Sequence, residues 1–416
     1  MTPVRISEVP NVISDRPAET HKVLIVSASV FPKRSGSAIV IENLVRYFSD
    51  REVAILGELG PFQRRPTRSA NSPQFSYFRS RLSFFGRGSR FLSKVRWQVH
   101  SRLVDRICSI AKSQSCNYIL GVYPDEYFCY AAYLASIKLD LPFSCYFHNT
   151  YLDNAAINSQ RAEKIQKKLF ARAEYVFVMS EGMQRHYAEQ FEPGKFIPLV
   201  HTFHEFPTPE PTVFAYPTIR PAKIVLFGNF NESNLDATKR FIGSAIDDND
   251  EIHIYSDVPK WLLGSRGLPM DSIQYHGSLS HLAFTDLIGE LRKYDLIALT
   301  HGFTGEYGDV EYRTIFPTRT IPMLLAGRPI LVHSPADSFL AQFFRSSNAG
   351  AVVDTPENSE IKIALQRIRN DSIFRKNLVE NASKASLRFL GINVANDFRK
   401  IVGIGPIREV LNLERK

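Results

Sequence analysis

One stretch in the second half of the chain, residues 295–335, constrains the fold more than any other. Residues 295–300 form a short apolar run after a helical segment, which is typical of a buried parallel strand. A polar, glycine-bearing loop (302–313) follows. Residues 318–325 then favour a helix, and 329–332 favour a second buried strand. This order of strand, long loop, helix and strand predicts part of an open parallel α/β sheet.

The loop between these two strands is where a ligand is expected. In an open parallel sheet, ligands bind where loops leave the carboxyl ends of the strands. A helix that begins near Thr318 would present unpaired N–H groups and its positive dipole end at this edge, which suits a diphosphate.

The length of the chain indicates two domains. At 416 residues it exceeds one ordinary core and suits two α/β domains of about 200 residues each. A hydrophobic content of 44% and a charged content of 22% are typical of a soluble globular protein. Residues 1–21 are polar, so we expect a disordered tail and not a signal peptide. The sequence contains no apolar run of about 18 residues, so no membrane-spanning helix is predicted.

The cysteines do not indicate a metal site. Cys108, Cys116, Cys129 and Cys145 form no C-x-x-C pair and have no histidine at ligand spacing. Reduced, buried cysteines of a cytosolic protein are the expected state.

Residues 22–205 carry the strand, loop and helix pattern of a Rossmann-like domain. The first strand leads into a loop that contains Ser35 and Gly36, for which a plain tight turn is an equally good interpretation. Two later strands end in His148 and in Ser180-Glu181. Ser180 also fits the N-cap of the following helix, and both roles are compatible.

Residues 206–221 are rich in proline and lack periodicity, so they are expected to form an extended, semi-rigid linker. A second domain, 222–390, restarts the pattern. Its first strand ends in Gly228-Asn229, and the next helix carries Lys239 and Arg240.

The segment 295–335 resembles the donor-nucleotide site of the retaining family 4 glycosyltransferases, which have the GT-B fold. Phe316-Pro317-Thr318 occupies the place of the family's Phe-Gly-Leu, and Ala326-Gly327-Arg328-Pro329 matches the small residue, Gly, X, Pro that closes the motif. The family motif places one Glu before and one Glu after the first of these elements, with seven residues between the two. Thr314 and Pro322 stand at those two positions here. In the family, the second Glu binds the hydroxyls of the nucleotide ribose.

The resemblance implies an α/β, GT-B architecture: two Rossmann-like domains facing each other across a cleft. The N-terminal domain would lie on the acceptor side, the C-terminal domain would bind the nucleotide sugar, and residues 391–416 would cross back as a helix onto the first domain.

The resemblance also implies a set of site residues. His148 coincides with the family histidine that contacts a hydroxyl of the donor sugar, although a structural role is the competing interpretation. Asn229 replaces the family's diphosphate-binding Arg, which leaves Lys239 or Arg240 as the cation, or a plain surface lysine. The cleft or acceptor residues are Ser35, Ser180 and Glu181. The expected donor-binding residues are Gly36, Gly228, Asn229, Lys239, Gly277, Glu311, Arg313, Phe316, Pro317, Thr318, Arg319 and Thr320.

The implied reaction transfers a sugar from a nucleotide diphosphate to a lipid-linked or polysaccharide acceptor with retention. No metal and no cofactor is expected, so cations and oriented N–H groups must stabilise the leaving diphosphate. Pro317 lacks an N–H, and Arg313 is the expected compensation. Glu311 or Glu306 is the hypothetical replacement for the ribose-binding carboxylate.

The net charge of +9 is concentrated in residues 61–106, which contain eleven Lys or Arg and a single acid, Asp105. Interleaved aromatic residues suit an anionic membrane surface. Single-stranded nucleic acid and a solvated basic face are the alternatives. The resemblance favours the membrane, which implies a cytoplasmic protein located peripherally on the inner face of the plasma membrane, and makes nucleic acid an unexpected partner.

Two further hypotheses compete with the glycosyltransferase. A catalytically inactive GT-B-like binding or assembly subunit would explain the two replaced glutamates. A nucleic-acid-binding protein would explain only the basic segment, and its binding would weaken steeply with salt.

Overall fold

The structure, a computed structural model, describes residues 21–33, 35–60, 73–79, 95–153, 159–204, 216, 221–231, 233–279, 282–303 and 309–407. The expected tail, most of the linker 206–221, Glu306 and much of the basic segment lie outside these residues.

The N-terminal domain is built on a parallel sheet of seven strands in the order β3-β2-β1-β4-β5-β6-β7. Its central strands are buried on both faces because they are continuous apolar runs, as in VLIV of β1 and FSCYF of β5. The strands are β1 (Val23–Val26), β2 (Val53–Leu59), β3 (Gln74–Arg79), β4 (Tyr118–Tyr123), β5 (Phe143–Phe147), β6 (Val176–Val178) and β7 (Phe196–Pro198).

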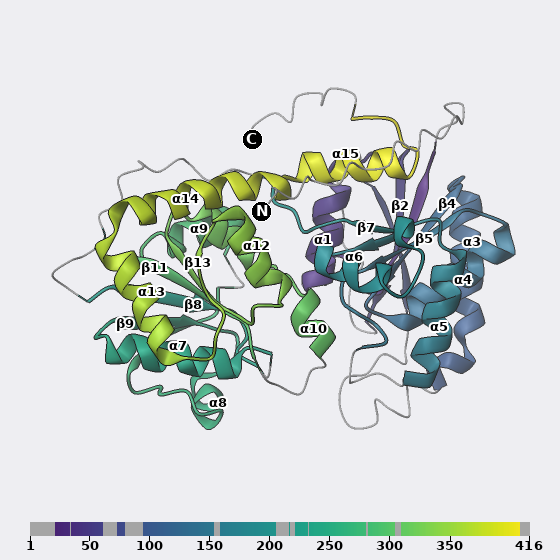
Figure 1. Cartoon of the computed structure of the whole chain (residues 1–416). Coiled ribbons are helices and arrows are strands. Elements are labelled where there is room, and N and C mark those ends of the chain that lie inside the picture. Colours follow the sequence, from purple (N-terminus) through teal and green to yellow (C-terminus); the bar gives the residue numbers. More distant parts are fainter. Residues whose placement is uncertain are drawn as a thin grey trace.

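Helices cover both faces of this sheet, and α3, α4 and α5 lie together on the side away from the second domain (Figure 1). Asp125 caps α4 by accepting from the backbone N–H groups of Tyr127 and Phe128 at 2.9 and 3.2 Å. The helical elements are α1 (Gly36–Val45), α3 (His100–Ser113), α4 (Glu126–Leu139), α5 (Ser159–Arg172), α6 (Glu181–Ala188) and the 3₁₀ turn η1 (Pro193–Lys195).

The C-terminal domain contains a second parallel sheet, of six strands in the order β10-β9-β8-β11-β12-β13. The strands are β8 (Lys223–Phe227), β9 (Glu251–Tyr255), β10 (Ile273–Gly277), β11 (Leu296–Thr300), β12 (Ile330–His333) and β13 (Ala351–Val353). The helices are α7 (Leu235–Asp247), α8 (Lys260–Ser265), α9 (Phe284–Leu291), α10 (Asp309–Thr314), α11 (Thr320–Leu325), α12 (Phe339–Ser347), α13 (Asn358–Asn370) and α14 (Ser372–Ser386), followed by the 3₁₀ turn η2 (Leu387–Phe389).

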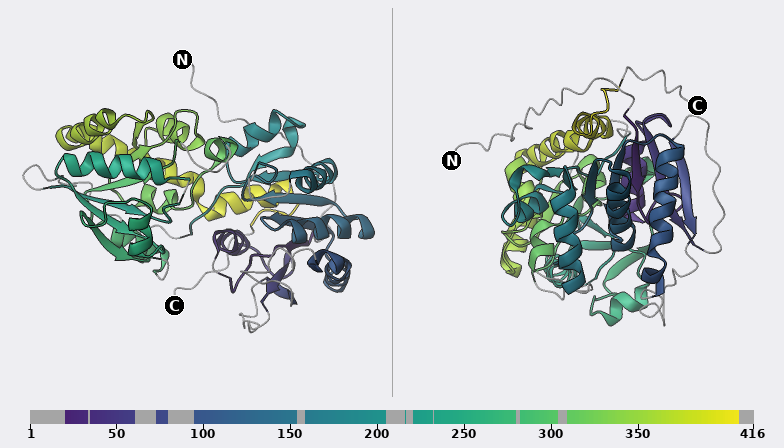
Figure 2. Two further views of the ribbon diagram at one scale, coloured as in Figure 1. Left: turned by 90° about the horizontal axis from the view of Figure 1, so that it is seen from below. Right: turned by 90° about the vertical axis from the view of Figure 1, so that its right-hand side faces the viewer.

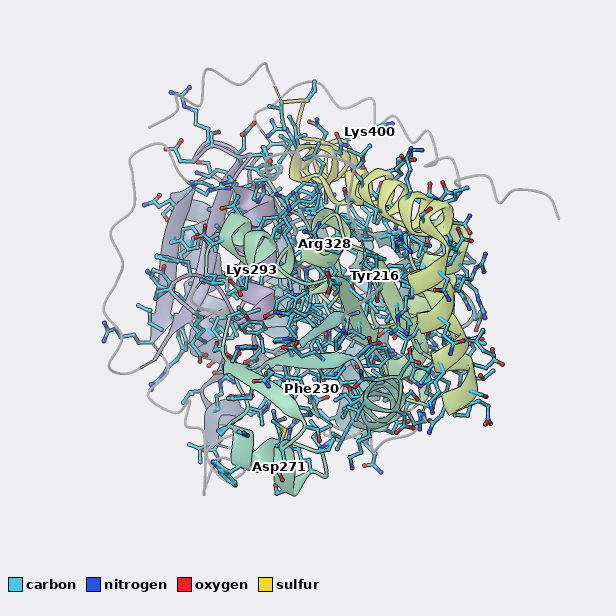
Figure 3. All side chains as sticks on the ribbon, turned by 90° about the vertical axis from the view of Figure 1, so that its left-hand side faces the viewer. Tyr216, Phe230, Asp271, Lys293, Arg328 and Lys400 are labelled. Carbon is cyan, nitrogen blue, oxygen red and sulfur yellow. The ribbon has the colours of Figure 1, made fainter. Side chains whose placement is uncertain are left out.

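In the second domain, apolar side chains lie in the interior and charged side chains lie at the surface. Phe230 is buried in the interior, while Lys293 is exposed (Figure 3). Arg328, in the turn after α11, donates through Nε to the carbonyl of Tyr294 at 2.8 Å, which ties that turn to the C-terminal end of α9.

The last helix, α15 (Gly391–Ile401), leaves the second domain and lies along the first (Figures 1 and 2). Phe398 packs against Phe48 and Phe177, with ring centroids 5.9 and 5.2 Å apart. Arg399 pairs with Glu52 and donates to the carbonyl of Tyr47 at 3.2 Å. The end of the chain therefore completes the surface of the domain in which the chain begins.

Two Rossmann-like domains face each other, so the predicted fold class is confirmed. The segment 295–335 differs in detail from its prediction. The expected loop contains α10, which packs against α6 and α12. The following helix begins at Thr320 and not at Thr318, because the Thr320 N–H donates to the carbonyl of Pro317 at 3.0 Å in a preceding turn.

The four cysteines are buried and free. Burial raises the pKa of the Cys116 thiol to about 11. Within the described ranges, no helix is long and apolar enough to cross a membrane. The same ranges hold no group of three or more His, Cys, Asp or Glu side chains that could bind a metal ion.

Candidate functional site

Two cavities, of about 350 and about 390 Å³, lie between the domains and are lined by residues of both. They share part of their walls, and the first contains mainly apolar side chains while the second contains mainly polar ones. We call them the apolar cavity and the polar cavity, and we call their shared wall the junction. The junction consists of His201, Gly228, Asp257, Thr318 and Arg319.

Gly228 brings the backbone close to Arg319 at the junction. It directly follows β8 and has a φ of +123°, a conformation that favours glycine. A Cβ built on it would lie 2.5 Å from Nη1 of Arg319. Nη2 of Arg319 donates to the carbonyl of Thr300 at 3.1 Å, at the end of β11. The guanidinium therefore spans the carboxyl ends of two adjacent strands, which is where an open α/β sheet binds its ligand.

Arg319 carries an uncompensated charge. Burial lowers the pKa of its guanidinium to about 10, so it remains protonated at pH 7. No carboxylate of the described part of the chain lies within ion-pair distance of it. A half-buried cation without a carboxylate partner is costly unless an anion binds beside it. Arg319 therefore makes the junction a candidate anion site.

The two cations expected on α7 lie elsewhere. Arg240 pairs with Asp236 at 2.8 Å and stacks over the ring of Phe303, with its guanidinium carbon 4.8 Å from the centroid. Lys239 is exposed, and its Nζ lies 2.9 Å from a Cβ built on Gly267, in the loop after α8. Neither side chain lines the cavities.

The turn before α11 forms part of the cavity walls, and two of its backbone N–H groups are already hydrogen-bonded. Pro317 lines the polar cavity and Thr318 the junction. The N–H groups of Thr320 and Ile321 donate within the turn, at 3.0 and 3.4 Å, and so are already used. Oγ1 of Thr320 is fully buried and has no hydrogen-bond partner among the described atoms. The guanidinium of Arg319 is the positively charged side chain that this turn places at the junction.

His148 directly follows β5 and lines the polar cavity. Its backbone N–H donates to the carbonyl of Tyr123 at 2.9 Å, and its ring packs edge-on against Tyr146 with centroids 4.3 Å apart. Both ring nitrogens lack a partner within the described residues. Burial, with a smaller contribution from His201, lowers the pKa of His148 well below its usual value. The neutral ring can donate from one nitrogen and accept at the other, as a sugar hydroxyl requires.

His201 was not among the residues predicted from the sequence. It lies at the junction, two residues after Leu199, whose N–H extends the pairing of β7 with β6. Burial lowers its pKa to about 3, so its ring is also neutral. Like His148, His201 is a polar residue that follows a short strand, and this pattern could have identified it in the sequence.

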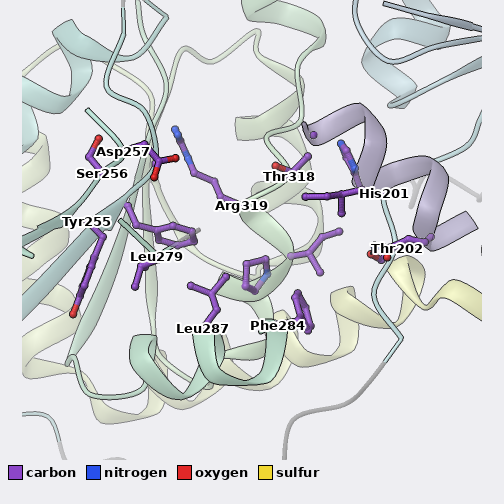
Figure 4. A pocket seen from close by; sticks show the side chains of 17 residues that line it. His201, Thr202, Tyr255, Ser256, Asp257, Leu279, Phe284, Leu287, Thr318 and Arg319 are labelled. Atoms are coloured by element: carbon purple, nitrogen blue, oxygen red, sulfur yellow. Dashed lines mark hydrogen bonds between the residues drawn. The ribbon is translucent and has the colours of Figure 1, made fainter. Parts of the chain in front are cut away.

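Asn149 and Asn229 join His148 in the polar cavity, together with Asn231, Ser233 and His301. Amide, hydroxyl and imidazole groups therefore dominate this wall. The apolar cavity is lined at its far end by Ile39, Leu279, Phe284, Leu287, Ile321 and Pro322. Figure 4 shows Arg319 and Asp257 at one end of this cavity and Phe284 and Leu287 at the other.

Ser180 and Glu181 join the two domains beside the polar cavity. Oγ of Ser180 accepts from the N–H of Met183 at 3.1 Å and donates to the carbonyl of Thr314 at 2.6 Å, so it caps α6 and bridges the domains. Glu181 pairs with Arg388. A Cβ on Gly182 would lie 2.7 Å from Cβ of Phe339, which shows how closely α6 approaches the second domain.

Phe316 anchors the turn before α11 in an aromatic cluster of the second domain. Its ring stacks on Phe389 with centroids 5.3 Å apart and also contacts Phe339 and Phe343. One edge of Phe316 lines the polar cavity. The aromatic cluster thereby fixes the backbone that leads to Thr318 and Arg319.

The remaining predicted residues are distributed around the site. Gly36 lines the apolar cavity, and Ser35 next to it is exposed and caps α1 by accepting from Ala38 at 3.3 Å. Gly277 has a φ of +80° and accepts from Ser256 at 2.7 Å, outside the cavity walls. Arg313 is exposed and lies 3.7 Å from Asp337. The backbone of Glu311 belongs to α10, and its side chain lies outside the described atoms.

No family model and no curated protein matches the sequence. Solved structures do match the fold. Sucrose-phosphate synthase from Thermosynechococcus elongatus superposes with a TM-score of 0.66 at 13% identity, covering 92% of this chain and 98% of that one. HepE from Anabaena, in complex with UDP and glucose, gives 0.62 at 13% identity, with 92% and 99% covered.

The lipopolysaccharide outer core galactosyltransferase WaaB, in its apo form, gives a TM-score of 0.59 at 15% identity, with 92% of this chain and 99% of that chain covered. These superpositions span both domains of each protein. The chain therefore has the GT-B fold.

Proposed function

We propose that this protein is a glycosyltransferase that transfers a sugar from a nucleoside diphosphate to an acceptor hydroxyl. The observation that carries the proposal is the cation of Arg319, which lies without a carboxylate partner among the described residues at the junction of two interdomain cavities. A diphosphate is a dianion or trianion that links two unlike groups. Arg319 at the junction offers a positive charge to the diphosphate. The apolar cavity and the polar cavity each offer a different environment to one of the two groups that the diphosphate links. The UDP complex of HepE, which shares the fold, is consistent with such a ligand.

In the proposed reaction, the acceptor oxygen forms a bond to C1 of the sugar while the bond from C1 to the diphosphate oxygen breaks. The bonding electron pair leaves on the diphosphate, and the hydroxyl proton passes to a diphosphate oxygen. Arg319 stabilises the charge that develops on the leaving group. Neutral His148 positions a sugar hydroxyl in the polar cavity. Retention of configuration is proposed on the resemblance of residues 295–335 to retaining enzymes.

We expect only side chains and backbone groups of this chain to act together with Arg319. The proposal includes no metal and no cofactor, because a protonated guanidinium already supplies charge stabilisation at the diphosphate.

The acceptor is proposed to be lipid-linked or a polysaccharide, with the protein held peripherally at an anionic membrane. Support comes from the exposed cations on the outer helices of the first domain. Arg102 and Arg106 on α3 and Arg161, Lys164, Lys167 and Lys168 on α5 are all exposed. Arg96, which the predicted basic segment 61–106 grouped with Arg102 and Arg106, is instead held by Glu58 and Asp125 at 3.0 and 3.1 Å.

An inactive GT-B-like binding subunit is the second candidate, favoured by Thr314 and Pro322 at the two motif positions. Isothermal titration calorimetry with nucleoside diphosphates and their sugar conjugates, followed by product analysis, separates the two. An active enzyme binds one donor at micromolar strength and releases the diphosphate in the presence of acceptor. An inactive subunit binds without turnover.

The donor test uses Arg319→Ala with Lys376→Ala as its matched control. Lys376 is an exposed cation on α14, 3.7 Å from Glu380 and remote from the cavities. We expect Arg319→Ala to weaken diphosphate binding by about 30-fold or more, since charge-assisted hydrogen bonds contribute about 2 kcal/mol or more. Unchanged affinity in folded Arg319→Ala protein would refute the proposed diphosphate site.

A further inference from the structure

We propose that His201 binds the diphosphate of the donor from the side of the N-terminal domain, so that the diphosphate lies between His201 and Arg319. This inference rests on the proposed function and adds a second diphosphate-binding residue to it. It follows from the position of His201 between the two cavities, from the contacts that fix its backbone and from the state of its ring.

His201 belongs to the junction, where the apolar cavity and the polar cavity share a wall. A donor whose nucleoside occupies one cavity and whose sugar occupies the other places its diphosphate at this wall. The other four residues of the junction belong to the C-terminal domain. Among the described residues, His201 is therefore what the N-terminal domain contributes to the shared wall. Figure 4 shows His201 and Arg319 in the wall of the apolar cavity.

The backbone on both sides of His201 is held by hydrogen bonds. The N–H of Leu199 donates to a carbonyl at the end of β6 at 2.7 Å. The carbonyl of Thr202 accepts from a side-chain amide of α1 at 3.0 Å. The N–H of Phe203 donates to the carbonyl of Phe389 at 2.9 Å. Because its backbone is already fixed, His201 loses little conformational freedom when a ligand binds.

The ring of His201 is available to a ligand. Its nitrogens make no hydrogen bond to the described residues, and burial lowers the pKa of the ring to about 3. The neutral ring carries one N–H, which can donate to a phosphate oxygen. A bound anion favours the protonated ring, and a hydrogen bond between an ionised donor and a phosphate is stronger than a neutral one.

The charges at the junction favour a donor opposite Arg319. A diphosphate is a dianion or trianion, whereas the guanidinium of Arg319 supplies one positive charge. Asp257, which accepts from the Ser278 hydroxyl, brings a carboxylate to the same wall and would repel the diphosphate. An N–H donor from His201 offsets part of this repulsion, because it reaches the diphosphate from the other domain.

Inorganic pyrophosphate tests this contact, because it is a diphosphate without a nucleoside or a sugar. His201→Phe keeps a flat ring and removes both nitrogens. We expect it to weaken the binding of pyrophosphate and of UDP about tenfold each, measured by calorimetry in metal-free buffer. Arg319→Ala identifies the binding that belongs to the junction, since pyrophosphate bound at the exposed cations of α3 or α5 would survive that change.

His204→Phe is the matched control on the same segment. Nδ1 of His204 lies 2.8 Å from the hydroxyl of Tyr47, and His204 lines neither cavity, so this variant should keep the wild-type affinity for pyrophosphate. His201→Asn and His201→Gln each place an amide N–H near one of the two ring nitrogens. One of them should restore part of the affinity lost in His201→Phe. A loss that neither amide restores would assign His201 a structural role and contradict the inference.

The outcomes separate this inference from the proposed function. Unchanged pyrophosphate affinity in His201→Phe protein that is folded by circular dichroism would overturn the inference. A loss for UDP alone would also overturn it, because His201 would then contact the pentose or the base. If Arg319→Ala weakens both ligands and His201→Phe weakens neither, the proposed function stands and only the role of His201 fails. If folded wild-type protein binds neither pyrophosphate nor any nucleoside diphosphate, both fall together.

Discussion

Gly228 and Arg319 are in direct contact across the ends of β8 and β11, and the space that a side chain at Gly228 would need is occupied by the guanidinium. A Cβ there would lie 2.5 Å from Nη1 and 3.2 Å from Cδ of Arg319. The absence of a side chain at Gly228 therefore makes room for the side chain of Arg319 as well as for a ligand.

Gly228→Ala is expected to displace Arg319 and to reduce nucleotide affinity by about tenfold or more. The positive φ adds about 1 kcal/mol of backbone strain, which lowers the free energy of unfolding. Calorimetry and urea denaturation measure the two effects. Gly243→Ala on α7 is the control: its Cβ meets nothing within 4 Å, so helix propensity should make it neutral or slightly stabilising. Full affinity in Gly228→Ala would show that the Arg319 position is not fixed by this contact.

Gly182→Ala should push the two domains apart at α6. Its Cβ would lie 2.7 Å from Cβ of Phe339 and 3.0 Å from Cα of Thr314, and neither neighbour is a flexible side-chain end. We expect a loss of about 1–3 kcal/mol in the free energy of unfolding. Small-angle X-ray scattering should show a larger radius of gyration. Gly194→Ala, whose Cβ meets nothing within 4 Å, should change neither quantity.

The protein should lose stability as the pH falls from about 6.5 to 4, because the pKa of buried His333 is lowered to about 4. The unfolded chain takes up a proton in this window that the folded chain does not. The stabilising difference is therefore complete above pH 6.5, and its loss approaches about 3 kcal/mol at pH 4. The main cause is burial, and the positive charge of Arg240, whose Nε donates to Nε2 of His333 at 3.3 Å, lowers the pKa further.

Urea denaturation between pH 4.5 and 7.5 measures this slope. His333→Gln removes one titrating group and should flatten the profile, although it lowers stability at pH 7. His201→Gln should also flatten it, since burial lowers the pKa of His201 to about 3. A profile as steep in both variants as in the wild type would assign the acid sensitivity to other groups.

Charge reversal at Lys164, Lys167 and Lys168 on α5 tests the proposed membrane surface. Each exposed lysine near an anionic bilayer contributes about 1 kcal/mol, so the triple Glu variant should bind anionic liposomes at least about 100-fold more weakly. Co-sedimentation with anionic and with zwitterionic vesicles measures this loss of binding. Reversal of Lys260, Lys362 and Lys376 in the other domain is the control. Loss of oligonucleotide retention instead of liposome binding would favour nucleic acid.

The central strands were predictable because parallel strands buried on both faces are uninterrupted apolar runs. The two strands that sequence reasoning missed, β3 and β7, are the two edges of the first sheet. Edge strands are half solvated, and β3, which lies within a basic segment, has exposed ends and a single buried residue, Tyr77. Their apolar signal is correspondingly weak, so only the pairing with β2 and β6 reveals them.

Part of the candidate site was predictable, either because residues directly follow a strand or because they lie in the segment 295–335. His148 and Gly228 were found because parallel strands bring their carboxyl ends to one edge. Arg319 was among the expected residues, but the sequence did not show that it lines the cavities while Lys239 and Arg240 on α7 do not, because the sequence does not give the rotation of that helix. The contact between Arg319 and Gly228 joins residues 91 positions apart. Such a contact depends on how α11 packs, which no local pattern encodes.

The return of α15 to the first domain has a consequence for how the protein is made. During synthesis the N-terminal domain emerges first, but Phe48 and Phe177 stay uncovered until Phe398 has left the ribosome. Glu52 likewise lacks its ion-pair partner until Arg399 has been synthesised. The domain that begins the chain is thus the last to be completed, and a ribosome that stalls within the second domain would leave both domains without their final shape.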